Sequence, residues 1–379
     1  MPLNSRTPLP KRVFMTSDTV GGVWTYALEL TNYLSGIDVE VQICVLGPPP
    51  SRLQEKAARR AGAASLEVSR LPLDWTAASE SELDVTAAEL QDRARDWSAD
   101  IVHLNAPAQA GMKEWDLPLT ISAHSCVGTW WAHAGKGAMP PDLAWRARRT
   151  GVGLTLADAV IAPSASFARD LAALYGAVTP ITAVHNGRTL FPATEPINRA
   201  DVVFTAGRLW DAGKNLRVIG EAARLSGRNI YAAGPQNGPN GETADLSHLA
   251  LLGTLAHEAM QQWYRRAAVF VSMSKYEPFG LSVLEAAQAG AALVLSDIAT
   301  FRELWDGAAI FIDPDDPAEL AEAILRLMAS PHARSVLAAA AAERSRAYSA
   351  MRMGAETMNI YSRVLAARAA PLVQLEAGT

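Results

Sequence analysis

Short apolar runs rich in β-branched residues alternate along this chain with amphipathic segments of helix length, and the alternation starts a second time near the middle. Such runs are buried on both faces when they lie in a parallel sheet, and the intervening helices cover those faces. The pattern therefore predicts two doubly wound α/β domains. The expected strands of the first are residues 12–16, 39–46, 101–104, 119–123, 159–162 and 181–185, and those of the second are 202–206, 229–232, 249–252, 269–273, 292–295 and 309–312.

The segment 186–199 separates the two series of strands. It contains Gly187, Pro192 and Pro196 and shows little periodicity. We therefore expect a first domain at residues 1–187 and a second at 188–352. Doubly wound folds bind ligands in a cleft at the carboxyl ends of their strands, so that edge is where a site is expected.

Composition and charge exclude several classes of protein. Hydrophobic residues make up 49% of the 379 residues and charged residues 19%, which is typical of a folded globular chain. The net charge of −5 argues against a nucleic-acid partner held on a broad basic face. Only Cys44 and Cys126 are present, without the spacing of metal ligands, so we expect neither zinc nor a disulfide scaffold and favour a cytoplasmic location.

The sequence gives no sign of a membrane span. No window of 18 apolar residues occurs, and residues 1–10 lack the apolar core of a secretory signal. Peripheral contact with the inner face of a membrane stays open as an alternative. The sequence carries no signature of an oligomeric state.

The most informative stretch is KYEPFGLSVLEAAQAG, residues 275–290. An apolar strand leads into a loop with Glu277 and a Pro-Phe-Gly turn, and a helix with Glu285 in its early turns follows. Such a turn can offer main-chain amides to an oxyanion, while the two carboxylates accept hydrogen bonds from diols. The alternative is that Glu277 is a loop carboxylate and Glu285 faces solvent near a helix start.

A second stretch, AGRLWDAGKNL at residues 206–216, leaves a strand and carries Arg208 and Lys214. Two fixed cations at the carboxyl end of a strand suit a diphosphate leaving group. Near the chain start, Gly21 and Gly22 open a helix after the first strand, which permits close backbone approach to a ligand. Each stretch has a structural alternative, an exposed pair of cations near a helix cap or a tight strand–helix turn.

His103 and His124 both end expected strands of the first sheet, where a side chain can reach a site at the strand ends. Trp130, Trp131 and His133 follow in an expected loop, where the aromatic rings could stack on a sugar or cover apolar surface.

Arg146, Arg148 and Arg149 form the strongest basic run, on an expected helix. They are either a solvated face or an anchor for an anionic acceptor or lipid head group.

Together these motifs resemble the retaining glycosyltransferases of family 4. Their GT-B fold has two Rossmann-like, doubly wound parallel-sheet domains facing across a cleft. The signature of that family is two glutamates eight positions apart around Pro-Phe-Gly, which Glu277 and Glu285 match. The resemblance implies that Glu277 contacts hydroxyls of a donor sugar and Glu285 the ribose of its nucleotide. The amides of Phe279, Gly280 and Leu281 would line the sugar and diphosphate.

The same resemblance implies further site residues. Arg208 and Lys214 would bind the donor phosphates, the loop of Gly21 and Gly22 would face the phosphate and the acceptor, and His124 would contact the donor sugar near the reaction centre.

The chain departs from the family pattern at two places. Asn215 follows Lys214 where glycine is frequent, and Arg188 with Thr189 stands where an apolar residue and an aspartate commonly follow Asn-Gly.

The resemblance implies a retaining transfer of sugar from a nucleoside-diphosphate sugar to a hydroxyl of a glycan, glycolipid or small molecule. The nucleotide sugar is a co-substrate, and we expect no cofactor. We also expect no metal, because no Asp-x-Asp motif follows a strand and fixed cations can neutralise the diphosphate. The alternatives are a nucleotide-sugar epimerase, a phosphorylase, or a non-catalytic nucleotide-sugar-binding protein.

The last helix, expected at residues 353–371, has an apolar stripe formed by Met358, Tyr361, Val364 and Leu365. In proteins of the GT-B fold the final helix commonly crosses back, so we expect it to pack on the first domain.

Overall fold

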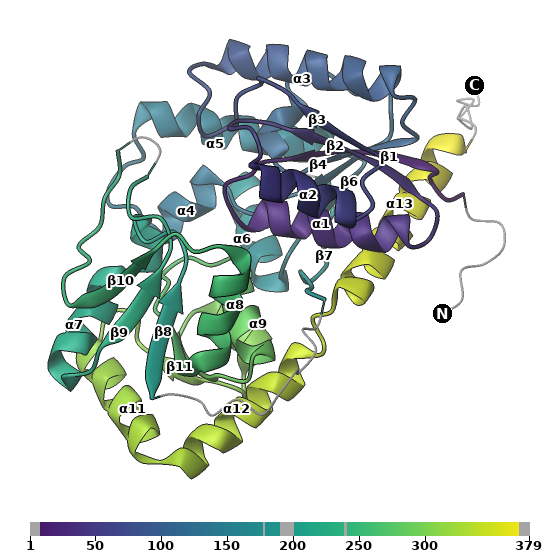
Figure 1. Ribbon diagram of the computed structural model, residues 1–379. Coiled ribbons are helices and arrows are strands. Elements are labelled where there is room, and N and C mark those ends of the chain that lie inside the picture. Colours follow the sequence, from purple (N-terminus) through teal and green to yellow (C-terminus); the bar gives the residue numbers. More distant parts are fainter. Residues whose placement is uncertain (1–7, 177–178, 190–200, 239–240, 371–379) are drawn as a thin grey trace, which may run out of the picture.

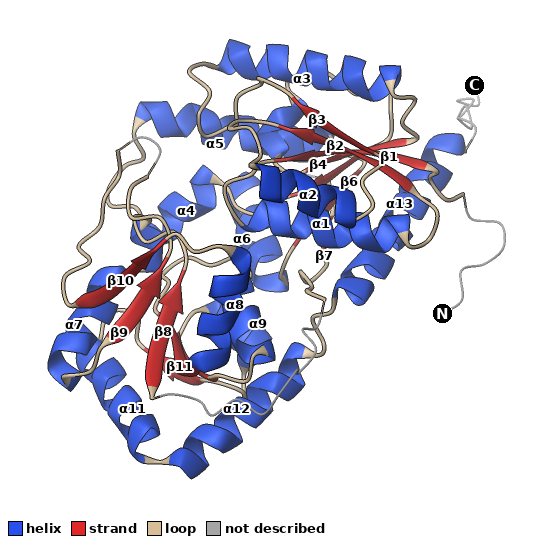
Figure 2. Ribbon diagram, in the orientation of Figure 1, coloured by secondary structure: helices blue, strands red, loops and turns tan. Residues whose placement is uncertain are grey.

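The computed structural model describes residues 8–176, 179–189, 201–238 and 241–370 (Figure 1). Two separate parallel sheets, each covered by helices on both faces, make up the chain (Figure 2). The first sheet has seven strands in the order β3-β2-β1-β4-β5-β6-β7, and the second has six in the order β10-β9-β8-β11-β12-β13. The predicted fold class, two doubly wound parallel-sheet domains, is therefore confirmed.

The first sheet and its helices are drawn from residues 12–183. The strands are β1 (Arg12–Ser17), β2 (Glu40–Val45), β3 (Ser65–Val68), β4 (Ile101–Leu104), β5 (Leu119–Ser122), β6 (Ala159–Ala162) and β7 (Ile181–Ala183). The helices are α1 (Gly22–Ser35), α2 (Arg52–Arg60), α3 (Glu80–Asp96), the 3₁₀ turn η1 (Pro107–Ala110), α4 (Val127–Ala134), α5 (Pro141–Leu156) and α6 (Ala165–Tyr175).

The second sheet and the helices after it begin at residue 202. The strands are β8 (Val202–Ala206), β9 (Ile230–Ala233), β10 (Leu249–Gly253), β11 (Ala267–Ser272), β12 (Ala292–Ser296) and β13 (Ile310–Ile312). The helices are the 3₁₀ turn η2 (Ala212–Lys214), α7 (Leu216–Ser226), α8 (His257–Arg266), α9 (Leu281–Gln288), α10 (Ala299–Trp305), α11 (Pro317–Ala329), α12 (Pro331–Ser345) and α13 (Ala350–Ala369).

Buried apolar residues on both faces explain why runs such as β1, β4, β11 and β12 form central strands. In β1, Val13 and Met15 belong to one core cluster and Phe14 to another, and all three are fully buried. Side chains alternate between the faces of a strand, so a continuous apolar run serves two cores at once. The edge strand β3 was not predicted, because its sequence SLEV is only half-buried and mixes polar with apolar residues.

Direct contacts between α10 of the second domain and the start of α6 of the first hold the two domains together. The Glu303 carboxylate on α10 accepts the amides of Ala165 and Ser166 at the start of α6, at 2.8 and 2.6 Å. Burial raises the pKa of Glu303, but hydrogen bonds from His185, Ser166 and Ala165 have the larger combined effect. They lower the pKa of Glu303 to about 2. The carboxylate therefore caps α6 of the first domain from the second.

Helix α13 lies beside α1 of the first domain (Figure 1). Met353, Met358, Tyr361 and Val364 belong to the same buried cluster as Val13 and Leu30. The domain boundary at 187/188 lies among described residues, shortly before the undescribed segment 190–200, and stays a prediction. In the parts of the chain described, no helix combines the length and apolar character needed to cross a membrane.

Truncating Met358 to alanine should lower the free energy of unfolding by about 2–5 kcal/mol, the range for emptying a buried methionine site. Met351→Ala on the same helix is the matched control, because Met351 is 74% exposed whereas Met358 is 1% exposed. Urea unfolding of both variants measures the difference. Equal stabilities would contradict the packing of α13 on the first domain.

Candidate functional site

The Pro-Phe-Gly turn lies between β11 and α9. Gly280 has φ 91°, a left-handed conformation that favours glycine, and a Cβ there would come within 3.0 Å of the Phe301 ring. The Pro278 carbonyl accepts the Ser164 hydroxyl of the first domain at 2.7 Å, and Phe279 is buried. The turn therefore holds the N-terminus of α9 in place, with the first N–H groups of the helix lacking intrahelical partners.

Glu277 and Lys214 form an ion pair in which both side chains are largely buried. Lys214 ends η2, and Asn215 follows with φ 56°. Asparagine tolerates this left-handed conformation better than most residues, and its Nδ2 donates to the Pro314 carbonyl at 2.6 Å. Asn215 therefore replaces the glycine that is frequent in the family without disturbing the position of Lys214.

Asp211 is hydrogen-bonded to Arg208 and lies near enough to Lys214 to be affected by its charge. The sequence motifs did not point to this residue. Its Oδ2 accepts from Arg208 Nη2 at 2.8 Å, and its Oδ1 accepts the Gly213 amide at 2.9 Å. Burial raises the pKa of Asp211, but the charges of Arg208 and Lys214 outweigh burial and leave it below its usual value. A signal for this role was present in the sequence, because Asp211 is three residues from each cation.

The second domain meets the first at this cluster. Trp130 on α4 donates its Nε1–H to Asp211 Oδ1 at 3.0 Å. At the start of α1, a Cβ on Gly22 would come within 3.1 Å of Leu281 Cδ1. The structure thus brings Gly22, Arg208, Lys214, Glu277 and the start of α9 to one interdomain edge.

Two carboxylates of the first domain, Asp18 and Asp74, lie on the same side and were also missed. Burial raises the pKa of Asp18, while the Val20 amide, which donates to Oδ1 at 2.8 Å, and the charge of Arg208 oppose the rise. Burial raises the pKa of Asp74 to about 6, with the nearby Asp18 adding to the effect. Both belong to loops after strands, where sequence alone does not show which side chain turns inward.

Glu285 lies on α9 with its side chain 18% exposed. Its Oε1 is 3.1 Å from Arg188 Nε, and the Tyr264 hydroxyl is hydrogen-bonded to the carboxylate. Burial raises the pKa of Tyr264 well above its usual value, so the hydroxyl stays protonated and donates. Glu285 is therefore held by a hydrogen bond from Tyr264 and an ion pair with Arg188, and it does not face solvent freely.

His124 follows β5, and its Nε2 is 2.7 Å from Asn105 Oδ1. Asn105 Nδ2 donates to the Thr16 carbonyl at 2.6 Å, so Oδ1 must accept the Nε2–H of His124. The lone pair is then on Nδ1, which can accept a hydroxyl hydrogen. Burial lowers the pKa of His124 to about 3, so the ring is neutral near pH 7.

His103 is a core residue and not a side chain at the strand end. It is fully buried within β4, with Nε2 2.8 Å from the Ser122 hydroxyl and Nδ1 hydrogen-bonded to the Tyr361 hydroxyl of α13. Burial lowers the pKa of His103 to about 3.

The pKa of His103 is about 3 in the folded protein and 6.5 in the unfolded chain. Between these values the unfolded chain binds more protons, so the free energy of unfolding should fall as the pH drops from 6.5 to about 3. The expected slope for one histidine is about 1.4 kcal/mol per pH unit. His103→Gln should remove that share of the slope, measured as unfolding free energy against pH. His332→Gln, an exposed histidine, is the control. An unchanged slope in His103→Gln would contradict the assignment.

The predicted loop containing Trp130, Trp131 and His133 is wrong, because these residues lie on helix α4. The Cys126 thiol caps its start, accepting the Thr129 amide, and Tyr276 of the second domain hydrogen-bonds the Thr129 hydroxyl at 2.8 Å. Cysteine is an unusual N-cap and the helix is short, so this helix has only a weak signal in the sequence.

The basic run on α5 does not form a single face. Arg149 is 2% exposed and paired with Asp84 at 2.5 Å. It is therefore neither part of a solvated face nor an anchor for an anionic ligand, and both predictions are wrong for this residue. Arg148 forms an exposed ion pair with Glu80, and Arg146 donates to the Ala77 carbonyl at 2.8 Å. The partners of these three arginines come from distant segments of the chain, so the sequence around them does not indicate which of them is buried.

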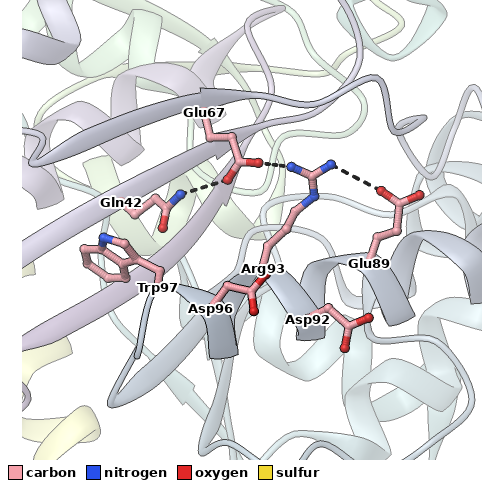
Figure 3. Close-up of a pocket in the computed structure, with 7 residues that line it drawn as sticks. All are labelled: Gln42, Glu67, Glu89, Asp92, Arg93, Asp96 and Trp97. Carbon is pink, nitrogen blue, oxygen red and sulfur yellow. Dashed lines mark hydrogen bonds and ion pairs between the residues drawn. The ribbon is translucent and has the colours of Figure 1, made fainter.

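A groove of about 500 Å³ lies elsewhere, between β2, β3 and the end of α3 (Figure 3). Arg93 is paired there with Glu67 and Glu89, and Gln42 donates to Glu67. Carboxylates dominate this lining, which does not suit a diphosphate. Across the described ranges, no group of three or more His, Cys, Asp or Glu side chains is arranged to hold a metal ion.

Comparison with known proteins places the chain among sugar-transferring enzymes. A model of Glycosyltransferase Family 4 matches residues 20–190, and a model of Glycosyl transferases group 1 matches residues 200–330. The chain is 25% identical to the alpha-maltose-1-phosphate synthase of Mycobacterium tuberculosis, over 92% of this chain and 97% of that protein. It is 26% identical to the D-inositol 3-phosphate glycosyltransferase of Xylanimonas cellulosilytica, over 92% and 93%.

Solved structures share the fold. The sucrose-phosphate synthase of Thermosynechococcus elongatus superposes with a TM-score of 0.77 at 17% identity, covering 94% of this chain and all of that one. The Anabaena protein HepE in complex with UDP-glucose gives a TM-score of 0.72 at 16% identity, covering 93% and 99%.

Proposed function

Because the chain belongs to the family 4 glycosyltransferases, enzymes that use nucleotide sugars, we propose that it transfers a sugar to a hydroxyl acceptor with retention of the anomeric configuration. The observation that carries this proposal is the cluster of Arg208, Asp211, Lys214 and Glu277 at the start of α9. Two cations, each paired with a carboxylate, stand beside a helix N-terminus that can bind an anion.

In the proposed complex, Arg208 and Lys214 contact the diphosphate, and the amides of Phe279, Gly280 and Leu281 line the diphosphate and sugar. Preorganised cations stabilise the charge that develops on a leaving diphosphate.

Three side chains are proposed to fix the sugar and the nucleotide. Glu277 accepts hydroxyls of the sugar, and Glu285 accepts the ribose diol. Neutral His124 offers Nδ1 to a sugar hydroxyl, a role that its pKa of about 3 supports.

The proposed step breaks the bond between the anomeric carbon and the diphosphate oxygen and forms a bond to the acceptor oxygen on the same face. The acceptor proton goes to the departing diphosphate oxygen, so no carboxylate has to act as a covalent nucleophile. Gly21 and Gly22 leave room for the acceptor beside the phosphates. Interdomain contacts such as Trp130 with Asp211 would exclude water and limit hydrolysis of the donor.

We propose that the acceptor approaches from the first domain. Asp18 and Asp74, held on that side, can accept hydrogen bonds from acceptor hydroxyls when ionised.

A thermal-shift screen of UDP, GDP, ADP and dTDP with their sugars tests donor binding. A ligand at about 100 times its dissociation constant should add roughly 2.7 kcal/mol of stability. Labelled donor is then incubated with and without a pool of hydroxyl acceptors. Acceptor-dependent product supports transfer, epimerised donor without acceptor supports an epimerase, and saturable binding without turnover supports a binding protein.

Activity should persist in excess EDTA, because the fixed cations Arg208 and Lys214 supply the charge that a metal supplies elsewhere. The rate of nucleoside diphosphate release is measured with and without chelator. Loss of activity on chelation, restored by magnesium or manganese, would contradict metal independence.

We also propose a cytoplasmic location, supported by the two free and buried cysteines, Cys44 and Cys126.

A further inference from the structure

Arg188 lies buried, 8% exposed, between helices of both domains. Its Nη1 donates to Glu29 Oε1 on α1 at 2.7 Å, and its Nε lies 3.1 Å from Glu285 Oε1 on α9. Its amide donates to the Tyr348 carbonyl, and its carbonyl accepts the Ala350 amide at the start of α13. Backbone and side chain are thus both fixed, and one guanidinium connects α1 with α9.

Glu29 is the anchor of this arrangement. Besides Arg188, it accepts the Thr189 amide at 3.3 Å and the Thr189 hydroxyl at 2.6 Å. Glu29 is 9% exposed and satisfied by three donors. The same buried guanidinium is paired with Glu285 through Nε.

The charges of Glu29, Arg188 and Glu285 do not cancel, and the excess is on the side of the carboxylates. Glu29, Arg188 and Glu285 together carry one net negative charge, since two carboxylates face one guanidinium. Glu285 also accepts the Tyr264 hydroxyl from α8. A carboxylate has about four lone-pair sites, and the Tyr264 hydroxyl uses one of them, so the Glu285 carboxylate keeps acceptor capacity for the two hydroxyls of a diol.

We propose that Arg188 is a positioning residue for nucleotide recognition: through its ion pair with Glu285, and its own anchoring on Glu29, it fixes this carboxylate in place for the ribose diol. The inference rests on the proposed contact between Glu285 and the ribose. Since the guanidinium is anchored on α1, the ribose contact is complete only when the two domains meet as they do here.

The test compares the affinities of UDP, GDP and ADP with those of their 2′,3′-dideoxy forms by calorimetry, using the base that binds best. The ratio of the two affinities isolates recognition of the ribose hydroxyls. Arg188→Met should reduce the ratio about tenfold, the scale of losing a charge-assisted orientation. Arg188→Lys should restore part of it. With the donor concentration varied at saturating acceptor, Arg188→Met should raise the KM for the donor and leave kcat near wild type, because the ribose contact is equal in the ground and transition states.

Arg149→Met is the matched control, because it also removes a buried arginine from an ion pair but lies in the first domain beside Asp84. It should lower the melting temperature without changing the hydroxyl ratio. If Arg188→Met does not fold, the double variant Arg188→Met/Glu29→Gln removes one charge of each sign and serves in its place.

An Arg188→Met protein with the wild-type ratio would overturn the inference, provided that Glu285→Ala loses the ratio. If Glu285→Ala keeps the wild-type ratio of the affinities for the nucleotide and its dideoxy form, the proposed contact of Glu285 with the ribose is wrong. The proposed role of Arg188 is then wrong as well. A ratio lost equally in Arg149→Met would show a general effect of stability and would also overturn the inference.

Discussion

Lys214→Ala and Arg208→Ala are each expected to lower the turnover rate by at least about 100-fold, the scale of losing one preorganised charge-stabilising donor. Both side chains stand where a diphosphate is proposed to leave, Arg208 hydrogen-bonded to Asp211 and Lys214 ion-paired with Glu277. Steady-state rates at saturating donor and acceptor measure the loss.

Lys275→Ala is the matched control for these variants. Lys275 belongs to the same motif, but its Nζ pairs with Asp315 at 2.5 Å on the surface, outside the cluster. It should keep near wild-type turnover. A folded Lys214→Ala or Arg208→Ala protein with more than a tenth of wild-type turnover would contradict the proposed role of that residue.

The two glutamates of the motif should separate binding from turnover. Glu285→Ala is expected to weaken nucleoside diphosphate binding by about 10- to 100-fold, since it removes hydrogen bonds to a charged acceptor worth roughly 1.5–3 kcal/mol. Glu277→Gln should leave that affinity near normal, because free nucleotide lacks the sugar, but should cut turnover strongly.

Titration of free nucleoside diphosphate into both variants measures the affinities, and steady-state rates measure turnover. Glu322→Ala, an exposed carboxylate on α11, is the control and should change neither. Equal loss of affinity in Glu277→Gln and Glu285→Ala would remove the division of roles.

The sequence predicted the architecture well because strands buried on both faces are read directly from apolar runs. Val13, Phe14 and Met15 are fully buried, as such a run requires. It failed where burial is partial or local signals are weak. Strand β3 is half-exposed and therefore lacks the continuous apolar run of a buried strand. Helix α4 begins on a cysteine cap and therefore lacks the usual Ser, Thr, Asp or Asn at its start.

The candidate site was predicted from motif resemblance more than from spacing. Glu277 and Lys214 are 63 residues apart and meet only in the fold. Asp211, Asp18 and Arg188 were missed as site residues because their roles depend on partners from other elements. Arg149 shows the same limit, since only the fold reveals that Asp84 buries its charge.

The stereochemistry of the product tests the central claim most directly. The best-binding nucleotide sugar, with a defined anomeric configuration, is incubated with the acceptor pool, and the new glycosidic linkage is followed by proton NMR from the first turnovers. A retaining glycosyltransferase releases nucleoside diphosphate only with acceptor and gives a linkage of the same anomeric configuration as the donor. A linkage of inverted configuration, or a donor altered without any acceptor, would contradict it.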